Sequence, residues 1–254
     1  AGTLVNTSGD LTSSLGNSGS ASDSLKVPSL SLDSPLATDD VINSSEAASL
    51  TVSGTSTLIE DAQGVSVTVT DSASATATGA TTVSGGVWSL TVDVSGLSDG
   101  ALSLVANSVD AAGTGPAQAS TTSLSKETVA PAGHSVSFDQ ASINASNETA
   151  ISFTFAAGEV GAGYSYTLSS AGGGAPVTGT GTLATATDQI TGLDLSGLGS
   201  GTVTLSVVLT DTVGNEANAV TDTATKDTTA PGIAFDSPLA GDDVVNAAEA
   251  AATT

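Results

Sequence analysis

Acidic side chains are the residues of this chain best suited to chemistry, and they recur at intervals of roughly 100 residues. The adjacent aspartates Asp39 and Asp40 return as Asp242 and Asp243. Five further acids and one amide lie near the same boundaries: Asp99, Asp110, Glu127, Asp211, Asn215 and Asp227. Calcium prefers about six to eight oxygen ligands, which carboxylates and backbone carbonyls supply. We therefore predict calcium sites built from these ten residues. The alternative is that they are turn residues, because Asp and Asn side chains readily bond to the local backbone.

Catalysis has few candidate residues. His134 is the only histidine and has no counterpart in the other repeats, so we expect a surface residue rather than the base of a nucleophilic triad. Adjacent aspartates resemble a glycosidase pair poorly, because such acids flank a sugar and neighbours on an extended segment point to opposite faces. Trp88, Tyr164 and Tyr166 lie in alternating apolar runs, which favours core packing over sugar stacking. We predict that the chain is not an enzyme.

The charge balance excludes some partners. Asp and Glu number 26 against three Lys or Arg, and the net charge is −23. Such a chain repels phosphate backbones and anionic headgroups, so we expect neither nucleic acid nor membrane as a partner. Hydrophobic residues make up 39% of the sequence, which is too many for a disordered acidic tail. With no cysteine, disulfides and thiolate zinc sites are excluded.

The sequence repeats. Its three basic residues, Lys26, Lys126 and Lys226, are spaced by 100, and each stands shortly before a proline. The segment DSPLATDDVINSSEAA, from Asp33, returns as DSPLAGDDVVNAAEAA from Asp236. We therefore divide the chain into repeats. Residues 1–27 are expected to be the C-terminal part of a preceding module, 28–130 and 131–230 two complete modules, and 231–254 the N-terminal part of a following one.

Apolar residues alternate with polar ones inside each module. Examples are the run Val65, Val67, Val69 and the run from Val203 to Leu209. Period two indicates strands with one buried face, and Gly- and Ser-rich turns separate them. About seven short strands in about 100 residues are typical of an immunoglobulin-like sandwich. The predicted fold is all-β, with tandem antiparallel β-sandwich modules in a linear array.

This topology predicts where the acids meet. With seven strands, the two termini of a module lie at opposite ends. The loop after the first strand, with Asp39, Asp40, Asn43 and Glu46, then falls at the C-terminal end beside Asp99 and Glu127. The loop between the last two strands of the next module, Asp211 to Asn215, faces them. We expect the oxygens to converge at the junction, with Asp227, Asp242 and Asp243 at the next one.

The chain resembles the bacterial immunoglobulin-like repeats of giant surface adhesins exported by type I secretion, of the RTX type. The matching residues are DDVIN followed by Glu-Ala, the single Trp88 before an alternating strand, the run from Asp211 to Asn215, and DTTAP from Asp227. The likeness implies a stalk of modules with calcium at the junctions, projecting from a cell. Thr114 stands where the second module has Asn215, so the Asp110 site departs from the pattern.

The leading hypothesis is a stalk region of a bacterial cell-surface adhesin, extracellular, supporting cell adhesion and biofilm formation. Its partners are the neighbouring modules of the same chain. The alternative is a self-assembling extracellular filament or surface layer, in which copies of the chain are joined by strand exchange between the terminal segments. A sugar-binding module is a third hypothesis, weakened by an aromatic content of 3%.

Overall fold

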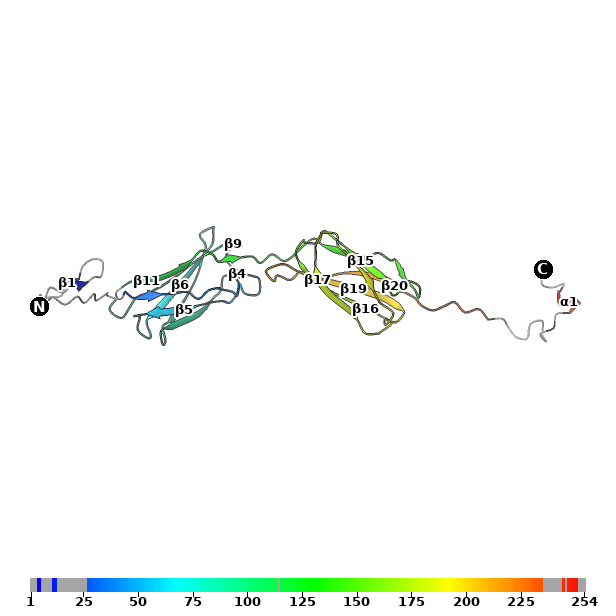
Figure 1. Ribbon diagram of the computed structural model, residues 1–254, viewed down its shortest axis with the longest axis horizontal. Helices are drawn as coiled ribbons and strands as arrows, with labels where there is room; N and C mark the ends of the chain where they lie inside the picture. Colours follow the sequence, from blue (N-terminus) through cyan, green and yellow to red (C-terminus); the bar gives the residue numbers. More distant parts are fainter. Residues whose placement is uncertain are drawn as a thin grey trace, which may run out of the picture.

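The computed structural model describes residues 27–113, 115–234, 244 and 246–250, and the backbone of the short strands β1 (Leu4–Val5) and β2 (Leu11–Thr12). Figure 1 shows two β-sandwiches end to end along the long axis, joined by a short linker. Helical structure in the described part is limited to one turn, α1 (Ala247–Ala250). The prediction of an all-β chain of tandem sandwiches is confirmed.

The first sandwich consists of two main sheets. One has the order β3-β5-β8 and the other β11-β10-β6-β7, while β4, β12 and β9 form a small sheet at the C-terminal end. The strands are β3 (Ser29–Leu30), β4 (Val41–Ile42), β5 (Leu50–Thr57), β6 (Gly64–Thr70), β7 (Thr76–Thr82), β8 (Val87–Val92), β9 (Gly100–Ala101), β10 (Ser103–Ser108), β11 (Ala117–Thr121) and β12 (Ser125–Lys126).

The second sandwich repeats this arrangement. Its sheets have the orders β13-β15-β18 and β14-β20-β19-β16-β17. The strands are β13 (Ser135–Phe138), β14 (Ser142–Ile143), β15 (Ile151–Ala156), β16 (Gly163–Ser170), β17 (Val177–Thr182), β18 (Gln189–Leu193), β19 (Gly201–Thr210) and β20 (Val220–Lys226). Pairing is antiparallel except for β4 with β12 and β14 with β20, which are parallel.

Each sandwich has its own apolar core. The buried apolar residues form one cluster between Leu30 and Leu124 and another between Val136 and Ala224. The alternation seen in the sequence produces these cores, since Val203, Leu205, Val207 and Leu209 all point inward from β19 and are 0% exposed. The two modules therefore have separate sources of stability.

The aromatic residues pack as the alternation predicts. Trp88 is 2% exposed, and its indole N–H donates to the Thr55 carbonyl at 3.3 Å. Tyr164 and Tyr166 pack against the second core, across from Gly181 and Gly179 on β17. A Cβ at either glycine would overlap the tyrosine ring. The tyrosines are thus built into the sandwich.

His134 is a correction to the sequence analysis. It is buried rather than exposed, and neither ring nitrogen has a hydrogen-bond partner among the described residues. The physical reason is the period-two pattern of β13, in which Val136 is also buried, extended back by one step to position 134. The prediction of a surface residue, which was based on the closeness of His134 to the linker, is therefore wrong.

Candidate functional site at the module junction

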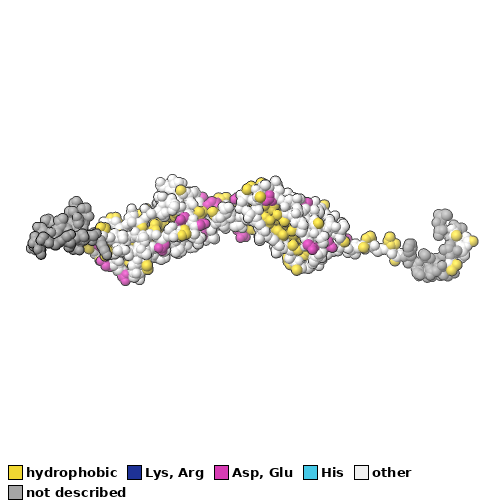
Figure 2. All heavy atoms as spheres, in the orientation of Figure 1, with side chains coloured by type: hydrophobic (Ala, Val, Ile, Leu, Met, Phe, Trp, Pro, Cys, Tyr) yellow, Lys and Arg dark blue, Asp and Glu magenta, His cyan; other side chains and the backbone are white. Residues whose placement is uncertain are grey.

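Three segments from both sandwiches meet at the linker. They are the loop after β4, which carries Asn43 and Ser44, the linker residue Glu127, and the loop from Asp211 to Asn215 between β19 and β20. Figure 2 shows acidic side chains at the surface around this linker. The junction is therefore the place where the predicted site can be examined.

Asn215 is the central residue of the junction. It is 0% exposed. Its amide nitrogen donates to the Glu127 carbonyl at 3.0 Å, to Glu127 Oε2 at 2.7 Å and to Asp211 Oδ2 at 2.8 Å. Its amide oxygen accepts the Ser44 backbone N–H at 2.8 Å. One side chain of the second sandwich thus bonds to both the linker and the first sandwich.

A second bond strengthens the same contact. Asn43 Nδ2 donates to the Val213 carbonyl at 3.1 Å. Asn43 also shapes its own loop, because its Oδ1 accepts the backbone N–H of Ser45 at 2.9 Å. The loop after β4 is therefore held in shape by bonds within the first sandwich as well as by its contact with the second.

The facing loop is shaped by Asp211. Its Oδ1 accepts the backbone N–H groups of Val213 at 2.9 Å and of Asn215 at 2.8 Å, a local Asp turn. Gly214 has a φ of 95°, in the left-handed region that favours glycine. This turn aims the Asn215 side chain at the linker.

The two junction carboxyls influence each other. Burial raises the pKa of Glu127, and the nearby Asp211 carboxyl raises it further. Burial acts in the same direction on Asp211, but hydrogen bonds from Asn215 and Val213 outweigh it and lower the pKa of Asp211. We assign the proton that the pair binds first to Glu127, because Asp211 receives more N–H groups. At neutral pH the junction therefore carries negative carboxylate charge, and the groups that stabilise this charge there are amide N–H donors.

The linker is fastened beyond Glu127 as well. Glu127 Oε1 accepts the Val129 N–H at 2.8 Å. Asp99 Oδ2 accepts the Thr128 N–H at 3.0 Å, and Lys126 Nζ lies 3.4 Å from Asp99 Oδ1. Burial would raise the pKa of Asp99, but these bonds from Thr128 and Lys126 lower it. Asp99 therefore holds the start of the linker against the first sandwich.

The remaining predicted ligands lie apart from this group. Asp39 Oδ1 accepts the Val41 N–H at 3.0 Å and Asp40 Oδ1 accepts the Leu36 N–H at 2.8 Å, both inside their own loop. They precede β4, and the Asp40 carbonyl accepts the N–H of Ser125, two residues before Glu127. The short strand β4 thus separates them from Asn43 at the junction. Their role as metal ligands stays a prediction.

Of the other four positions, two lie at other ends of the modules. Asp110 lies in the loop between β10 and β11, at the N-terminal end of the first sandwich. Asp227 follows β20, and its Oδ1 accepts the Thr229 N–H at 2.9 Å. Asp242 and Asp243, like Thr114, lie outside the described residues.

The donor set at the junction consists of oxygen atoms only. It comprises the carboxylates of Glu127 and Asp211, the amide oxygen of Asn215 and nearby carbonyls, and this hard set suits calcium. Among the described residues, no three His, Cys, Asp or Glu side chains are grouped so that they could hold a metal. An ion between the carboxylates would require Asn215 to turn its oxygen toward them. Calcium at the junction therefore stays a prediction.

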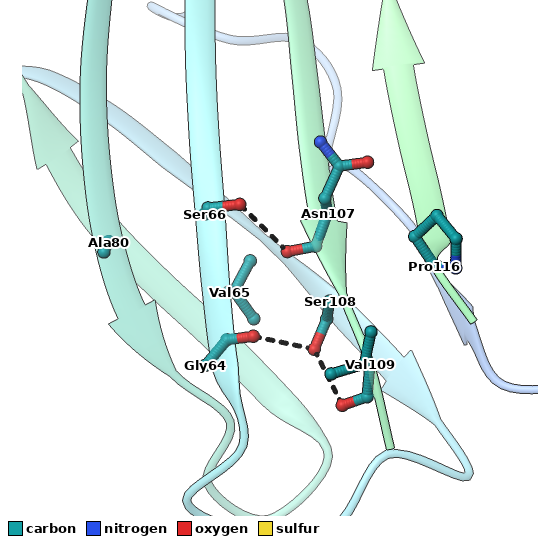
Figure 3. A pocket seen from close by; sticks show the side chains of 8 residues that line it. All are labelled: Gly64, Val65, Ser66, Ala80, Asn107, Ser108, Val109 and Pro116. Atoms are coloured by element: carbon teal, nitrogen blue, oxygen red, sulfur yellow. Dashed lines mark hydrogen bonds between the residues drawn. The ribbon is translucent and has the colours of Figure 1, made fainter. Parts of the chain in front are cut away.

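A pocket of about 310 Å³ lies elsewhere, on the first sandwich, at the ends of β6 and β10 (Figure 3). None of its eight labelled lining residues is ionisable. Ser108 Oγ donates to the Gly64 carbonyl at 2.8 Å, so the hydroxyl is engaged with the backbone. This pocket offers no acid or base for catalysis.

The buried lysines are residues whose role the sequence analysis missed. From the sequence, Lys126 and Lys226 indicated only the length of the repeat. In the structure they are 5% and 2% exposed, and they are hydrogen-bonded at equivalent positions of the two sandwiches. Two signals were available. Lys226 occupies the inward-facing phase of β20, two residues after the buried Ala224. The chain also has only three cations, all at this position of the repeat.

Comparisons with known proteins give structural neighbours only. No family model matches the chain, and no curated protein matches it. The tetra-tandem repeat in the extending region of a large adhesion protein is 26% identical over 78% of this chain and 48% of that chain, with a TM-score of 0.32. The structure described as "host cell surface retention of a 1.5-MDa bacterial ice-binding adhesin" is 24% identical over 80% of this chain and 66% of that one, with a TM-score of 0.46.

A third neighbour comes from a different kind of protein. The fibronectin(III)-like modules of Clostridium thermocellum CbhA are 12% identical over 78% of this chain and 94% of theirs, with a TM-score of 0.42. The chain spans about half the length of the first neighbour and two thirds of the second. Scores in this range do not assign a function. Among the described residues, no helix has the length and apolarity needed to cross a bilayer.

Proposed function

We propose that this chain is part of the stalk of a bacterial cell-surface adhesin, in which tandem β-sandwich modules carry a binding tip away from the cell. The observation that carries the proposal is the contact made by Asn215. It joins the second sandwich to the linker and to the first sandwich through side-chain bonds at 2.7–3.0 Å. A junction of this kind limits bending, which a stalk requires.

The array geometry supports the same role. Strands of about seven residues at roughly 3.3 Å per residue, with their loops, give each module a length on the order of 40 Å. Because the modules lie end to end, each one adds most of its length to the reach of the stalk (Figure 1). Tens of modules would place a tip far from the cell surface, in support of cell adhesion and biofilm formation.

Calcium belongs to the proposal as a stiffening ion. The raised pKa of Glu127 reflects a partly buried carboxylate beside a second one, and a divalent cation would remove that repulsion. Sites in extracellular modules bind calcium at about 10⁻⁴–10⁻³ M, which suits a site with two carboxylates. Magnesium would bind more weakly, because it demands a near-ideal octahedron.

Isothermal titration calorimetry tests the calcium site directly. The full chain should bind calcium with millimolar or submillimolar affinity, and the double variant Glu127→Gln with Asp211→Asn should lose one site. The matched control is Asp39→Asn with Asp40→Asn, which removes the same charge from a loop away from Asn215. If the control variant loses the site and the junction variant keeps it, the ion binds at the aspartate pair. An absence of calcium binding in every variant would refute calcium stiffening.

Strand-mediated assembly is the second candidate function. The edge strands β7 and β17 contain no charged residue, and uncharged edges are templates for pairing with another chain. The terminal segments 1–27 and 231–254, on which strand exchange depends, lie largely outside the described residues. Sedimentation velocity decides between the candidates, because a stalk fragment stays monomeric at concentrations where a filament subunit polymerises.

A further inference from the structure

Each sandwich buries a lysine in the same place, and its ammonium is fully engaged. Lys226 Nζ donates to the carbonyls of Leu195 and Leu198, both at 2.6 Å, and pairs with Glu148 Oε2 at 2.7 Å. Lys126 Nζ donates to the Leu97 carbonyl at 2.5 Å and the Ser95 carbonyl at 3.3 Å. A buried charge is tolerated only when such partners replace water. The arrangement therefore depends on all its contacts at once.

The lysine is the last residue of the strand through which the chain leaves the sandwich. β12 ends at Lys126 and β20 ends at Lys226. Both strands pair in parallel with a short strand from the beginning of the sandwich, β4 or β14. The next residue continues the pairing, since Glu127 N donates to the Ile42 carbonyl at 2.9 Å and Asp227 N to the Ile143 carbonyl at 2.8 Å.

Tension along the array would load this contact in shear. The chain enters each sandwich before β3 or β13 at one end and leaves after β12 or β20 at the other (Figure 1). Pulling the ends apart draws the parallel strands in opposite directions along their length. The backbone bonds and the lysine bonds must then break together rather than one by one. The lysine fixes the exit strand to the turn at residues 195–198, or 95–97 in the first sandwich.

We propose that the parallel strand pair and its buried lysine form a load-bearing clamp at the C-terminal end of each module. Its task is to resist unfolding when force acts along the stalk. The clamp uses residues of a single sandwich, so it operates without calcium and whatever the tip binds. It also gives a physical reason for a chain with only three basic residues to keep one at every repeat.

Single-molecule stretching of the full chain in chelator tests the clamp. The chain has no cysteine, so introduced cysteines define the pulling points. The pair Ala132→Cys and Thr229→Cys pulls on the exit strand, whereas Ala132→Cys with Ala171→Cys pulls the same sandwich through the turn after β16. Both pairs use exposed positions. Lys226→Met should raise the unfolding rate at a given force by about tenfold or more in the first geometry, the size expected for lost bonds to a charged donor.

The direction of pulling separates a clamp from a general stability effect. In the second geometry, the increase in unfolding rate caused by Lys226→Met should be at least several-fold smaller than in the first geometry. Thr225→Val, an exposed neighbour on the same strand, should change neither rate. An equal acceleration in both geometries, or none in the first, would overturn the proposal. If Lys226→Met prevents folding, Glu148→Gln provides the same comparison, because it removes the ion pair and leaves the two carbonyl bonds.

Discussion

At the residue scale, the junction depends on which atoms Asn215 presents to its neighbours. Its amide nitrogen bonds to both Glu127 and Asp211, and its oxygen bonds to Ser44. The Asn215 side chain is removed from water at the centre of the junction, where an unpaired polar group costs about 1–3 kcal/mol. Substitutions at this position therefore report on the junction more directly than those at any exposed acid.

Asn215→Asp distinguishes an amide-bonded junction from a calcium-bound one. In chelator the variant places a third carboxylate beside Glu127 and Asp211, so repulsion should loosen the junction. In calcium the added oxygen ligand should restore it and tighten ion binding. The readout is the width of the distance distribution between spin labels at Thr51→Cys and Thr178→Cys, one on each sandwich. A distribution that stays broad in calcium would contradict a junction ion, and Asn215→Ala, which adds no charge, serves as the control.

Acid should tighten the calcium-free junction before it loosens it. The pKa of Glu127 is raised by folding, so the folded junction binds that proton more strongly and gains stability as the pH falls through this pKa. The pKa of Asp211 is lowered, so its contribution is lost only at more acidic pH. The label distribution in chelator should therefore narrow in mild acid and broaden again in stronger acid. Glu127→Gln should abolish the narrowing, whereas persistence of the effect would assign it to another group.

At the scale of strands and cores, the two sandwiches should respond independently. Leu205→Ala truncates a side chain that is 0% exposed in the second core and should cost about 2–5 kcal/mol there. Calorimetry should show one melting transition moved to lower temperature and the other unchanged, because the core clusters share no residue. Thr202→Ala, at an exposed position of the same strand, is the control. A shift of both transitions by the same amount would show that the cores unfold as one unit.

The long strands could be predicted from the sequence, and the short ones could not. The alternation from Tyr164 to Leu168 and from Val203 to Leu209 predicts β16 and β19, because a period of two reveals the buried face. The two-residue strands β4 and β14 are too short to show any period. Their parallel pairing with the exit strand joins residues far apart in the sequence, and no local pattern encodes it.

The expected topology of the sandwiches predicted some of the junction residues but not all of them. The sequence placed Glu127, Asp211 and Asn215 at one junction, and the structure brings these three together. It also grouped Asp39 and Asp40 with them, because the segment before β5 was taken as a single loop. The strand β4 divides that segment, and of its predicted residues Asn43 makes the contact, together with the backbone N–H of Ser44. The part of Ser44 was missed, because a backbone N–H bond depends on loop geometry that residue spacing does not contain.

At the scale of the whole molecule, the proposed stalk function depends on keeping the modules in line. Each sandwich is stable through its own core, so an array can bend only at its junctions. The Asn215 contact resists bending by hydrogen bonds alone, while the two carboxylates beside it repel each other at neutral pH. Calcium would convert that repulsion into attraction across the junction.

Small-angle X-ray scattering of the full chain in calcium and in chelator tests this claim most directly. In millimolar calcium the chain should be straight, with a largest dimension close to the summed lengths of its two sandwiches and terminal segments. Removing calcium should shorten the average dimension, and Glu127→Gln with Asp211→Asn should make the profile insensitive to calcium. Scattering profiles that coincide in calcium and in chelator for the unsubstituted chain would contradict calcium stiffening and leave the stalk joined by Asn215 alone.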